Sequence, residues 1–327
     1  MKETVKQKIL KIMEEQKGNT LSGEDLAKNL GVTRAAVSKA VASLKTDGYI
    51  IDSKTNSGYI FSSENDFYSA QSVENYLKLQ NLEIDIREEL DSTNTQLKLI
   101  AQKGEKEGYV LIANKQTTGR GRRGHTFFSP SSGLYMSILL RPTISASDSL
   151  LITTAAAVAV SRAIEKVSDK KCEIKWVNDI YSEGRKLCGI LTEASIDFEG
   201  GTLDYAVLGI GVNLSDPKGD FPKEIENIAA SIFGKREFTN TEKSILTAEI
   251  LNEFFALYEN LSDKTYMKEY RDRSFLIGKE VDIIISDKKI DEAVVLDIDE
   301  DAHIIVKYKN GEIKALFSGD VSVKTQK

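Results

Sequence analysis

Arginine and glycine alternate in one short stretch, Gly119-Arg-Gly-Arg-Arg-Gly124, which brings Arg120, Arg122 and Arg123 close together in the chain. Arginine carries a permanent positive charge on a planar fork that binds carboxylate and phosphate oxygens. Glycine has no Cβ, so its backbone can bend sharply and approach a ligand closely. The stretch therefore predicts a site for an anion. Taken alone, the same segment is also compatible with an exposed basic hairpin loop.

The glycines at 119, 121 and 124 match the pattern G-x-G-x-x-G, which is a weak signal by itself. A dinucleotide-binding fingerprint needs a strand before the pattern and a helix after it. A strand is predicted at 109–113, but the loop leads into a second β-like run at 134–140. The sequence also lacks a P-loop lysine motif and the catalytic motifs of protein kinases. We therefore expect a loop between two strands.

Other polar side chains stand where predicted helices begin and strands end. Ser92 and Thr93 precede a predicted helix, where their hydroxyls either cap the helix or, with its N–H groups, bind a polar ligand group. Lys175 stands between apolar residues of a predicted strand, and a buried ammonium needs an anionic partner such as a nucleotide phosphate. Asn178 and Asp179 follow that strand. Asp179 either contacts Mg²⁺ or forms a hydrogen bond that fixes its loop.

Several motifs in one order along the chain together resemble those of the biotin protein ligases. They are Asp91-Ser-Thr-Asn94, the glycine-arginine loop, Lys175-Trp-Val-Asn-Asp179, Arg185-Lys-Leu-Cys-Gly-Ile-Leu191 and Gly209-Ile-Gly-Val-Asn-Leu214. With its N-terminal segment, the chain most resembles the bifunctional type that is also the biotin operon repressor. The resemblance covers nearly the whole chain.

The resemblance implies roles for individual residues. Ser92, Thr93 and Asn94 would contact the ureido ring of biotin, and Gln116 would reach the ligand from the end of its strand. Lys186 would lie on the carboxylate and the α-phosphate of the intermediate. The full set implied for biotin and biotinyl-5′-AMP is Ser92, Thr93, Asn94, Gln116, Arg120, Gly121, Arg122, Lys186 and Gly189.

The nucleotide would be bound by a second implied set, Arg123, Phe127, Asn178 and Asn213. Phe127 would stack on adenine, although some relatives have tryptophan at this position. Some relatives also have arginine where this chain has His125.

The resemblance implies a reaction in two steps. The carboxylate of biotin attacks the α-phosphorus of ATP in the presence of Mg²⁺, and a lysine of biotin carboxyl carrier protein then attacks the biotinyl-5′-AMP. Because a carboxylate is ionised at neutral pH, the first step needs positioning and charge neutralisation rather than a general base. The second needs a neutral amine, and desolvation or Asp179 would assist. The expected catalytic residues are Lys186, Arg122, Lys175 and Asp179, of which Asp179 would also contact the metal.

Hydrophobic periodicity, with the resemblance, places these residues in a multidomain α+β chain. We predict a winged helix-turn-helix over 1–63 and a linker over 64–82. A mixed α/β ligase domain with a mainly antiparallel sheet is expected over 83–272, and an SH3-like β-barrel over 273–327. Within the ligase domain, a long, alanine-rich helix from Asp148 to about Lys166 is predicted to be core.

The N-terminal segment contains residues that mark the helix ends of a helix-turn-helix. Ser22 is a predicted N-cap, Gly31 ends that helix, and Thr33 caps the next one. The predicted DNA contacts are Thr33, Arg34, Ser38 and Lys39, with Lys54 and Asn56 at the tip of a two-stranded wing. The resemblance implies operator DNA as partner and a homodimer when biotinyl-5′-AMP is bound. A protein-docking module of the same fold is the alternative.

Composition fits these expectations. The 327 residues carry a net charge of −6, whereas the first 60 hold 10 Lys and Arg against 7 Asp and Glu, which suits a nucleic-acid-binding head on an acidic body. Two cysteines and two histidines predict neither a disulfide framework nor a zinc cluster, and they fit a reducing cytoplasm. The longest apolar run, near 150–160, is too short to span a bilayer, so no membrane association is expected.

Two other functions stay open at this point. A transcription regulator that only senses a metabolite would bind its ligand without releasing pyrophosphate. A lipoate-type ligase would use the same kind of catalytic domain, but the glycine-arginine loop and the Lys175–Asp179 motif favour biotin.

Overall fold

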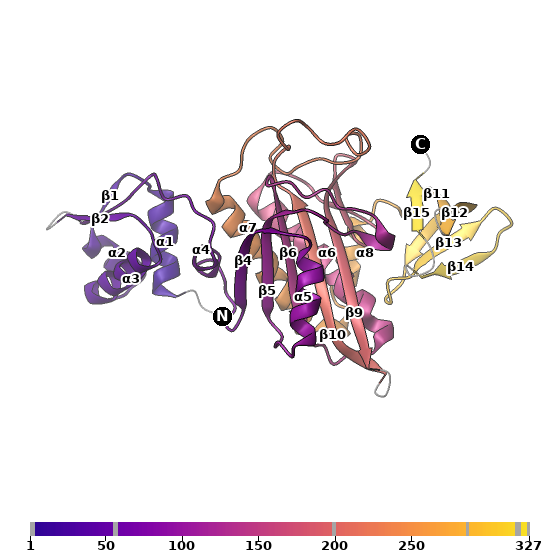
Figure 1. Ribbon diagram of the computed structural model, residues 1–327, viewed down its shortest axis with the longest axis horizontal. Helices are drawn as coiled ribbons and strands as arrows, with labels where there is room; N and C mark the ends of the chain where they lie inside the picture. Colours follow the sequence, from indigo (N-terminus) through magenta and orange to yellow (C-terminus); the bar gives the residue numbers. More distant parts are fainter. Residues whose placement is uncertain (1–3, 55–57, 198–200, 286–287, 318–321, 326–327) are drawn as a thin grey trace. The chain divides into compact units, whose positions relative to one another are not determined.

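The computed structural model describes residues 4–54, 58–197, 201–285, 288–317 and 322–325 (Figure 1). The chain forms two compact units. The smaller unit comprises Met1–Gln80 and Thr239–Asn252, and the larger unit comprises Asn81–Phe238 and Glu253–Lys327. None of the helices in the described ranges combines the length and the apolar character that a membrane crossing requires.

The smaller unit begins with three helices and a small sheet, and their ends follow local capping chemistry. Ser22 Oγ accepts hydrogen bonds from the backbone N–H groups of Glu24 and Asp25, and this helix ends at Gly31, whose φ is +64°. Thr33 caps the following helix. The elements are α1 Val5–Glu15, β1 Thr20–Leu21, α2 Gly23–Leu30, α3 Arg34–Thr46, β2 Ile51–Lys54 and β3 Gly58–Phe61. The predicted helix-turn-helix and its two-stranded wing are confirmed, and β1 adds a third antiparallel strand beside β3.

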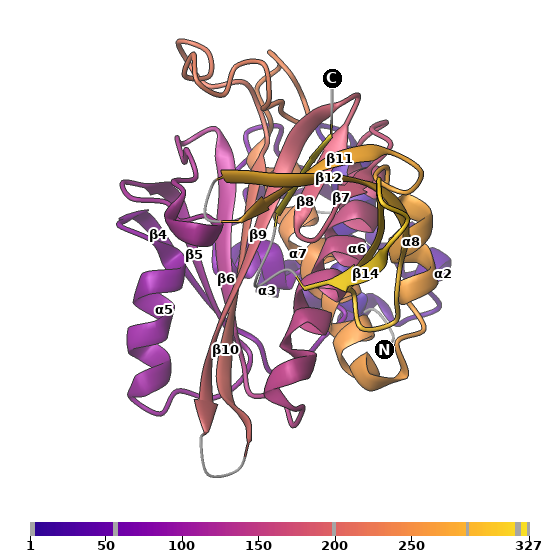
Figure 2. The same cartoon turned by 90° about the vertical axis from the view of Figure 1, so that its right-hand side faces the viewer.

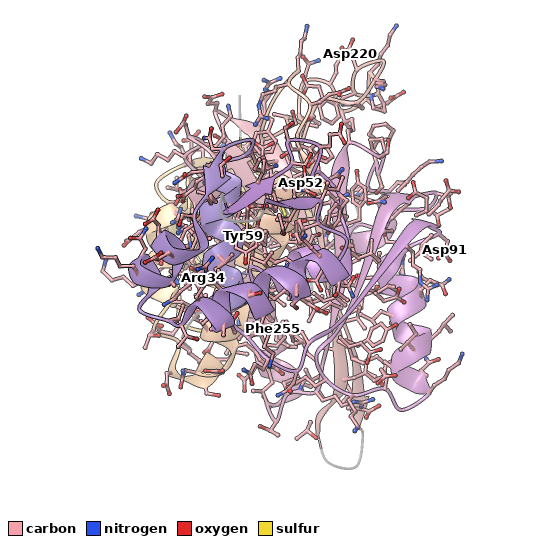
Figure 3. The ribbon with its side chains drawn as sticks, turned by 90° about the vertical axis from the view of Figure 1, so that its left-hand side faces the viewer. Arg34, Asp52, Tyr59, Asp91, Asp220 and Phe255 are labelled. Atoms are coloured by element: carbon pink, nitrogen blue, oxygen red, sulfur yellow. The ribbon has the colours of Figure 1, made fainter. Side chains whose placement is uncertain are left out.

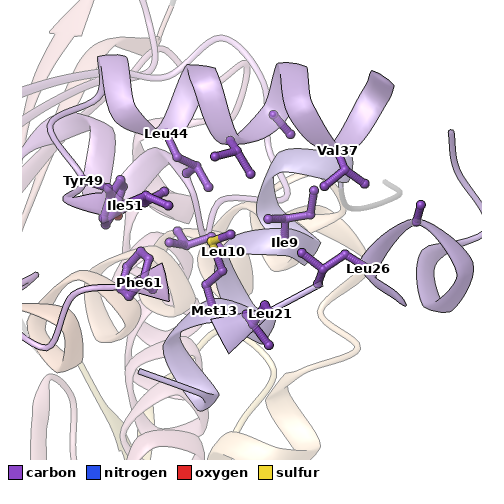
Figure 4. Packing of buried hydrophobic residues seen from close by; sticks show 13 residues of the cluster. Ile9, Leu10, Met13, Leu21, Leu26, Val37, Leu44, Tyr49, Ile51 and Phe61 are labelled. Atoms are coloured by element: carbon purple, nitrogen blue, oxygen red, sulfur yellow. The ribbon is translucent and has the colours of Figure 1, made fainter. Parts of the chain in front are cut away.

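One hydrophobic cluster holds this unit together (Figure 4). Val37, Val41 and Leu44 recur at helical spacing on α3 and are at most 2% exposed. They pack in the same cluster as Ile9 and Met13 of α1. The packing leaves the opposite face of α3 in solvent.

Residues 64–82, predicted as a linker, contain a short helix and are packed. Helix α4 spans Ala70–Glu74, and Ser69 caps it. The hydroxyl of Ser72 lies 2.8 Å from that of Ser244, and the hydroxyl of Tyr68 lies 3.0 Å from that of Thr247. Both partners belong to helix α7, Asn240–Tyr258. The polar composition of this segment suggests a linker, and its side chains form hydrogen bonds with α7.

The larger unit is built on a seven-stranded sheet in the order β4-β5-β6-β10-β9-β8-β7. Only β4 and β5 run parallel, so the predicted mainly antiparallel sheet is confirmed. The strands are β4 Glu83–Leu90, β5 Tyr109–Gln116, β6 Gly133–Leu140, β7 Glu173–Lys175, β8 Asp179–Ser182, β9 Arg185–Asp197 and β10 Thr202–Asn213.

Helices cover both faces of this sheet (Figure 2). Helix α5, Thr93–Gln102, packs Leu97 and Ala101 against β5, β6 and β10 on one face. Helix α6, Ser149–Val167, lies on the other face and is buried along most of its length, as predicted. Helix α8, Met267–Arg273, packs beside α6. The two faces therefore have different roles, because α5 begins at the site described below, whereas the described residues of α6 do not line it.

The C-terminal part of the larger unit is a five-stranded antiparallel sheet in the order β14-β13-β12-β11-β15. Its strands are β11 Glu280–Ile285, β12 Lys288–Ile298, β13 Ile304–Tyr308, β14 Ile313–Leu316 and β15 Ser322–Thr325. No closed barrel is seen among its described residues, so the SH3-like barrel stays a prediction. The turn between β12 and β13 accepts a hydrogen bond of 2.8 Å at Ala302 O from the indole of Trp176.

An ion network ties α8 to α6, and we expect it to stabilise the larger unit. Arg273 donates to both oxygens of Glu165 at 2.8 and 2.9 Å and to Glu269 at 2.9 Å. Burial opposes the charge on Glu165 and Glu269, but hydrogen bonds from Arg273 to both, and from Arg162 to Glu269, outweigh it and hold the pKa of each carboxyl below its usual value. The network should therefore stabilise the folded state above the unfolded pKa of about 4.3 and be lost as the pH falls through the lower folded pKa.

Arg273→Met should accordingly lower the free energy of unfolding by about 2 kcal/mol at pH 7, because it leaves two half-buried carboxylates without this partner. Urea unfolding at pH 7 and pH 3 would measure the difference. Lys268→Met is the matched control, since Lys268 pairs with Asp272 on the exposed side of the same helix. An equal loss of stability at both pH values would contradict the proposed electrostatic origin.

Candidate active site

A cavity of about 300 Å³ opens in the larger unit, within the size range of small-molecule sites. Its walls come from the N-terminus of α5, the loop after β5, and the strands β6 to β10. All predicted small-molecule contacts except Asn213 line it, namely Ser92, Thr93, Asn94, Gln116, Arg120, Gly121, Arg122, Arg123, Phe127, Lys175, Asn178, Asp179, Lys186 and Gly189.

The polar end of the cavity is the first turn of α5, where hydrogen bonds fix the side chains. Ser92 caps the helix. Gln116 Oε1 accepts hydrogen bonds from the backbone N–H and the hydroxyl of Thr93 at 2.8 and 3.1 Å. Asn94 Oδ1 accepts one from Ser137 Oγ at 2.6 Å. Ser92 thus caps the helix and also lines the cavity, and the ligand contacts of this turn stay a prediction.

Ser137 is a buried residue that the sequence reasoning missed. Its hydroxyl lies 2.8 Å from Thr93 Oγ1 as well as 2.6 Å from Asn94 Oδ1, and it is fully buried. The signal was present, because Ser137 is a polar residue inside the otherwise apolar run 134–140. Buried polar groups need hydrogen-bond partners, so such a position indicates a network.

The glycine-arginine loop folds back on itself as a hairpin, and residues 117–128 are named the lid here. Gly121 N–H donates to His125 O at 2.7 Å, and Phe127 N–H donates to Gly119 O at 2.9 Å. A Cβ on Gly119 would lie 2.3 Å from Phe127 O and 2.3 Å from Ser129 Oγ. Only glycine fits at this crossing. The turn is completed by Arg123, which has a φ of +55°.

Glycines also expose the backbone of β9 and β10 to the cavity. A Cβ on Gly189 would meet the ring of Phe127 at 3.1 Å, and one on Gly211 would meet it at 2.6 Å. The Phe127 ring therefore lies against these two glycines, with its edge toward Tyr135 at 6.3 Å between centroids. Whether Phe127 stacks on adenine stays a prediction.

Cations and their partners form the opposite wall. Lys186 Nζ lies 2.7 Å from Asp179 Oδ1, and Arg122 donates to Asn178 Oδ1 at 3.2 Å. Burial, and then the charge of Arg123, lower the pKa of Arg122. A guanidinium that is desolvated beside another cation gains most from an anionic ligand. The arrangement places the predicted cations in one cavity, and the anion site stays a prediction.

Two residues are not placed as the sequence suggested. Lys175 is half-buried rather than buried, and its ammonium lies 5.8 Å from the ring centroid of Tyr181. Lys175 lines the cavity, and its contact with a nucleotide phosphate stays a prediction. Asn213 lies behind the wall, where its amide donates to Ala230 O at 3.0 Å and to Lys186 O at 3.5 Å. It braces the backbone of Lys186 instead of facing the cavity.

The helix-turn-helix presents its predicted contact residues to solvent. Arg34 begins α3 (Figure 3), and Arg34, Ser38 and Lys39 are exposed. Thr33 is also exposed, but its hydroxyl accepts the N–H of Ala36. Lys54 lies in β2, and Asn56 lies outside the described residues.

Comparisons with known proteins show the family of the chain. The model of the biotin/lipoate A/B protein ligase family matches residues 87–213, a helix-turn-helix model matches 5–60, and the biotin protein ligase C-terminal domain matches 276–324. The bifunctional ligase/repressor BirA of Bacillus subtilis is 31% identical over 235 residues, which cover 71% of this chain and 72% of that protein. BirA of Escherichia coli is 27% identical over 321 residues, 94% of each chain.

A solved structure supports the same assignment. Biotin protein ligase from Aquifex aeolicus in complex with biotin and ATP matches with a TM-score of 0.61 and 26% identity, over 75% of this chain and 99% of that one. The chain therefore belongs to the biotin/lipoate A/B protein ligase family, among the biotin protein ligases that carry an N-terminal helix-turn-helix domain.

Proposed function

We propose that the chain attaches biotin to one lysine of biotin carboxyl carrier protein through biotinyl-5′-AMP, and that the adenylate-bound form represses biotin synthesis genes. The observation that carries the enzymatic part is the convergence of three features on one cavity. They are the polar first turn of α5, the glycine-containing segments of β9 and β10 against which Phe127 packs, and a group of cations. The ureido ring of biotin and the phosphate of the adenylate would each meet a suitable surface.

Different residues of the cavity bind biotin and neutralise charge in the first step. Thr93, Asn94 and Gln116 hold polar groups of biotin in a preorganised network, so little orientation remains to be done at the moment of reaction. Lys186 and Arg122 neutralise charge as the biotin carboxylate forms its bond to the α-phosphorus and pyrophosphate leaves. No general base is needed, since the attacking carboxylate is already ionised at neutral pH.

The site offers Mg²⁺ few protein oxygen ligands. No group of three or more His, Cys, Asp or Glu side chains that could hold a metal occurs within the described part of the chain. Asp179 and Asn178 offer oxygens beside Lys186 and Arg122, and ATP phosphates would supply most other ligands, as is usual for Mg²⁺. Bound there, the ion would supply further charge neutralisation.

Biotin-dependent exchange between ATP and pyrophosphate tests the proposal, with mass spectrometry of the protein-bound product. Exchange with retained biotinyl-5′-AMP is expected. Tight biotin binding without exchange would favour a regulator that only senses its ligand. Competition by octanoate or lipoate that matches biotin would favour a lipoate-type ligase instead.

Repression follows by linkage. We infer that the adenylate orders the lid, that the ordered lid favours a homodimer, and that the dimer presents two helix-turn-helix units to a two-fold operator. A gel-shift titration with the promoter of a biotin synthesis gene should show tighter binding when biotin and ATP are both present. Because ATP and the operator are both in the cytoplasm, we place the protein there.

Arg122→Gly should release biotinyl-5′-AMP faster, by about 10- to 100-fold, because it removes a charge-assisted hydrogen bond between the lid and Asn178. Loss of radiolabelled adenylate in a chase experiment measures the rate, and biotin label on bystander proteins gives a second readout. Lys106→Gly is the control, since Lys106 is exposed in the loop before β5. Retention equal to that of the wild type would contradict the role of Arg122 in closing the lid.

A further inference from the structure

The carboxylate of Glu193 lies where three elements of the larger unit meet. Glu193 belongs to β9, and it accepts hydrogen bonds from Asn94 Nδ2 at 3.0 Å and from Lys98 Nζ at 2.8 Å, both on α5. Arg120 of the lid approaches the same group, with NH1 3.2 Å from Oε1 and 3.4 Å from Oε2. One side chain thus joins the sheet, the helix and the lid.

Glu193 does not line the cavity, but two of its three partners do. Asn94 and Arg120 both face the cavity, whereas Lys98 does not. Any influence of Glu193 on a ligand must therefore pass through Asn94 or Arg120. This distinguishes Glu193 from the residues that contact the ligand directly.

The environment keeps Glu193 charged. Burial disfavours the carboxylate, but hydrogen bonds from Lys98 and Asn94, and then the charges of Lys98 and Arg120, outweigh burial and hold its pKa below the usual value. A carboxylate has only acceptor sites, about four of them, which suits three donors that converge on it. The group is therefore an acceptor for all three partners at neutral pH.

The contact also determines which way the amide of Asn94 points. Asn94 Nδ2 donates to Glu193 and to Leu191 O at 3.2 Å, while Oδ1 accepts from Ser137 at 2.6 Å. A flipped amide would place its oxygen against the carboxylate and against a carbonyl, which is repulsive. Glu193 thus specifies the orientation that Asn94 presents at the cavity.

We propose that Glu193 is a positioning residue of the ligase reaction, which orients the amide of Asn94 for biotin and attaches the lid to β9 through Arg120. This inference rests on the proposed function. Its two actions use different properties of the group. Orientation of Asn94 needs an acceptor oxygen, whereas attachment of Arg120 needs the negative charge.

Two substitutions separate these actions. Glu193→Gln keeps an acceptor oxygen for Asn94 but removes the charge, so it should speed release of biotinyl-5′-AMP about 3- to 10-fold and change KM for biotin less than about twofold. Glu193→Ala removes both and should also raise KM for biotin, by about tenfold, with a smaller effect on kcat. Lys98→Met is the control, because it removes the third partner and touches neither the cavity nor the lid.

A double-mutant cycle with Arg120→Met provides the decisive comparison. If Glu193 acts through Arg120, Glu193→Gln should add less than about 1.5-fold to the release rate once Arg120 is already methionine. Effects that multiply independently, or a Lys98→Met variant that releases adenylate as fast as Glu193→Gln does, would overturn the proposal. Pyrophosphate exchange by the wild-type protein is measured first, since its absence would refute the proposed function and not the role of Glu193. If the alanine variant fails to fold, the glutamine variant and the cycle still decide.

Discussion

Lys186→Met is expected to reduce biotin-dependent ATP–pyrophosphate exchange by about 100- to 1000-fold, the usual effect of removing one preorganised group that stabilises developing charge. Lys186 Nζ lies at the cavity, 5.9 Å from the ring centroid of Phe127 and 2.7 Å from Asp179. Its backbone is held on both sides, because its N–H donates to Ile228 O at 2.7 Å and its carbonyl accepts from Ala230 N–H at 2.9 Å. The ammonium is therefore presented from a fixed point, and methionine fills similar space without the charge.

The loss has two conceivable origins, and a second variant separates them. Removing Lys186 also leaves Asp179 without its ion-pair partner, which would place a less compensated negative charge beside the ATP phosphates. In Lys186→Met combined with Asp179→Asn this charge is absent. Exchange should stay low if the ammonium itself acts on the reacting groups. Recovery to within about tenfold of the wild type would show instead that Lys186 only neutralises Asp179.

Exchange is measured at saturating biotin and ATP, and thermal unfolding confirms that the variants are folded. Lys170→Met provides the matched control, because Lys170 forms a surface ion pair with Glu183 and lies outside this cavity. Its exchange rate should be unchanged. A Lys186→Met variant within about threefold of the wild type would remove Lys186 from the catalytic set.

Local signals in the sequence were sufficient for much of the fold. Ser22, Gly31 and Thr33 mark helix ends through their own side chains or dihedral angles, and such chemistry depends little on the rest of the chain. The same holds for the long α6, whose alanine-rich composition predicts burial. Residues 64–82 could not be assigned in this way, because their order comes from partners on α7 that are more than 170 residues away in the chain.

The site shows the same division between local and long-range information. Gln116 and Lys186 both line the cavity, and both were predicted from the resemblance to the biotin protein ligases, because a lysine beside a turn is by itself usually only solvated. Ser137 and Glu193 escaped prediction because each is recognised only by what it contacts on another element. Lys175 is half-buried and not buried for a related reason, since apolar neighbours in sequence do not determine how completely a long side chain is covered.

Gly209→Ala is expected to weaken biotin binding by about 10- to 100-fold. A Cβ at this position would lie 2.1 Å from Asn94 Oδ1 and 2.8 Å from its Cγ. Asn94 cannot easily move away, because Ser137, Leu191 O and Glu193 all hold its amide. Overpacking of this kind costs about 1–3 kcal/mol, and about 1.4 kcal/mol corresponds to a tenfold change in affinity.

The loss of biotin affinity in Gly209→Ala should come from displacement of Asn94 and not from backbone strain at residue 209. Gly209 pairs with Ser137 on β6 and Leu191 on β9 in regular antiparallel register, and its φ is not in the left-handed region. Gly104→Ala supplies the contrasting control, since Gly104 has a φ of +89° and open space around it. That variant should lose about 1 kcal/mol or more of stability while its affinity for biotin stays the same.

Isothermal titration with biotin alone measures the affinity without requiring catalysis. Asn94→Ala, alone and combined with Gly209→Ala, tests the cause directly. If displacement of Asn94 is the reason for the loss, Gly209→Ala should have little further effect in the Asn94→Ala background. The methyl group at residue 209 then has no Asn94 amide to displace. A Gly209→Ala protein that binds biotin within about twofold of the wild type would show that the first turn of α5 can shift, and that the orientation of Asn94 does not determine biotin affinity.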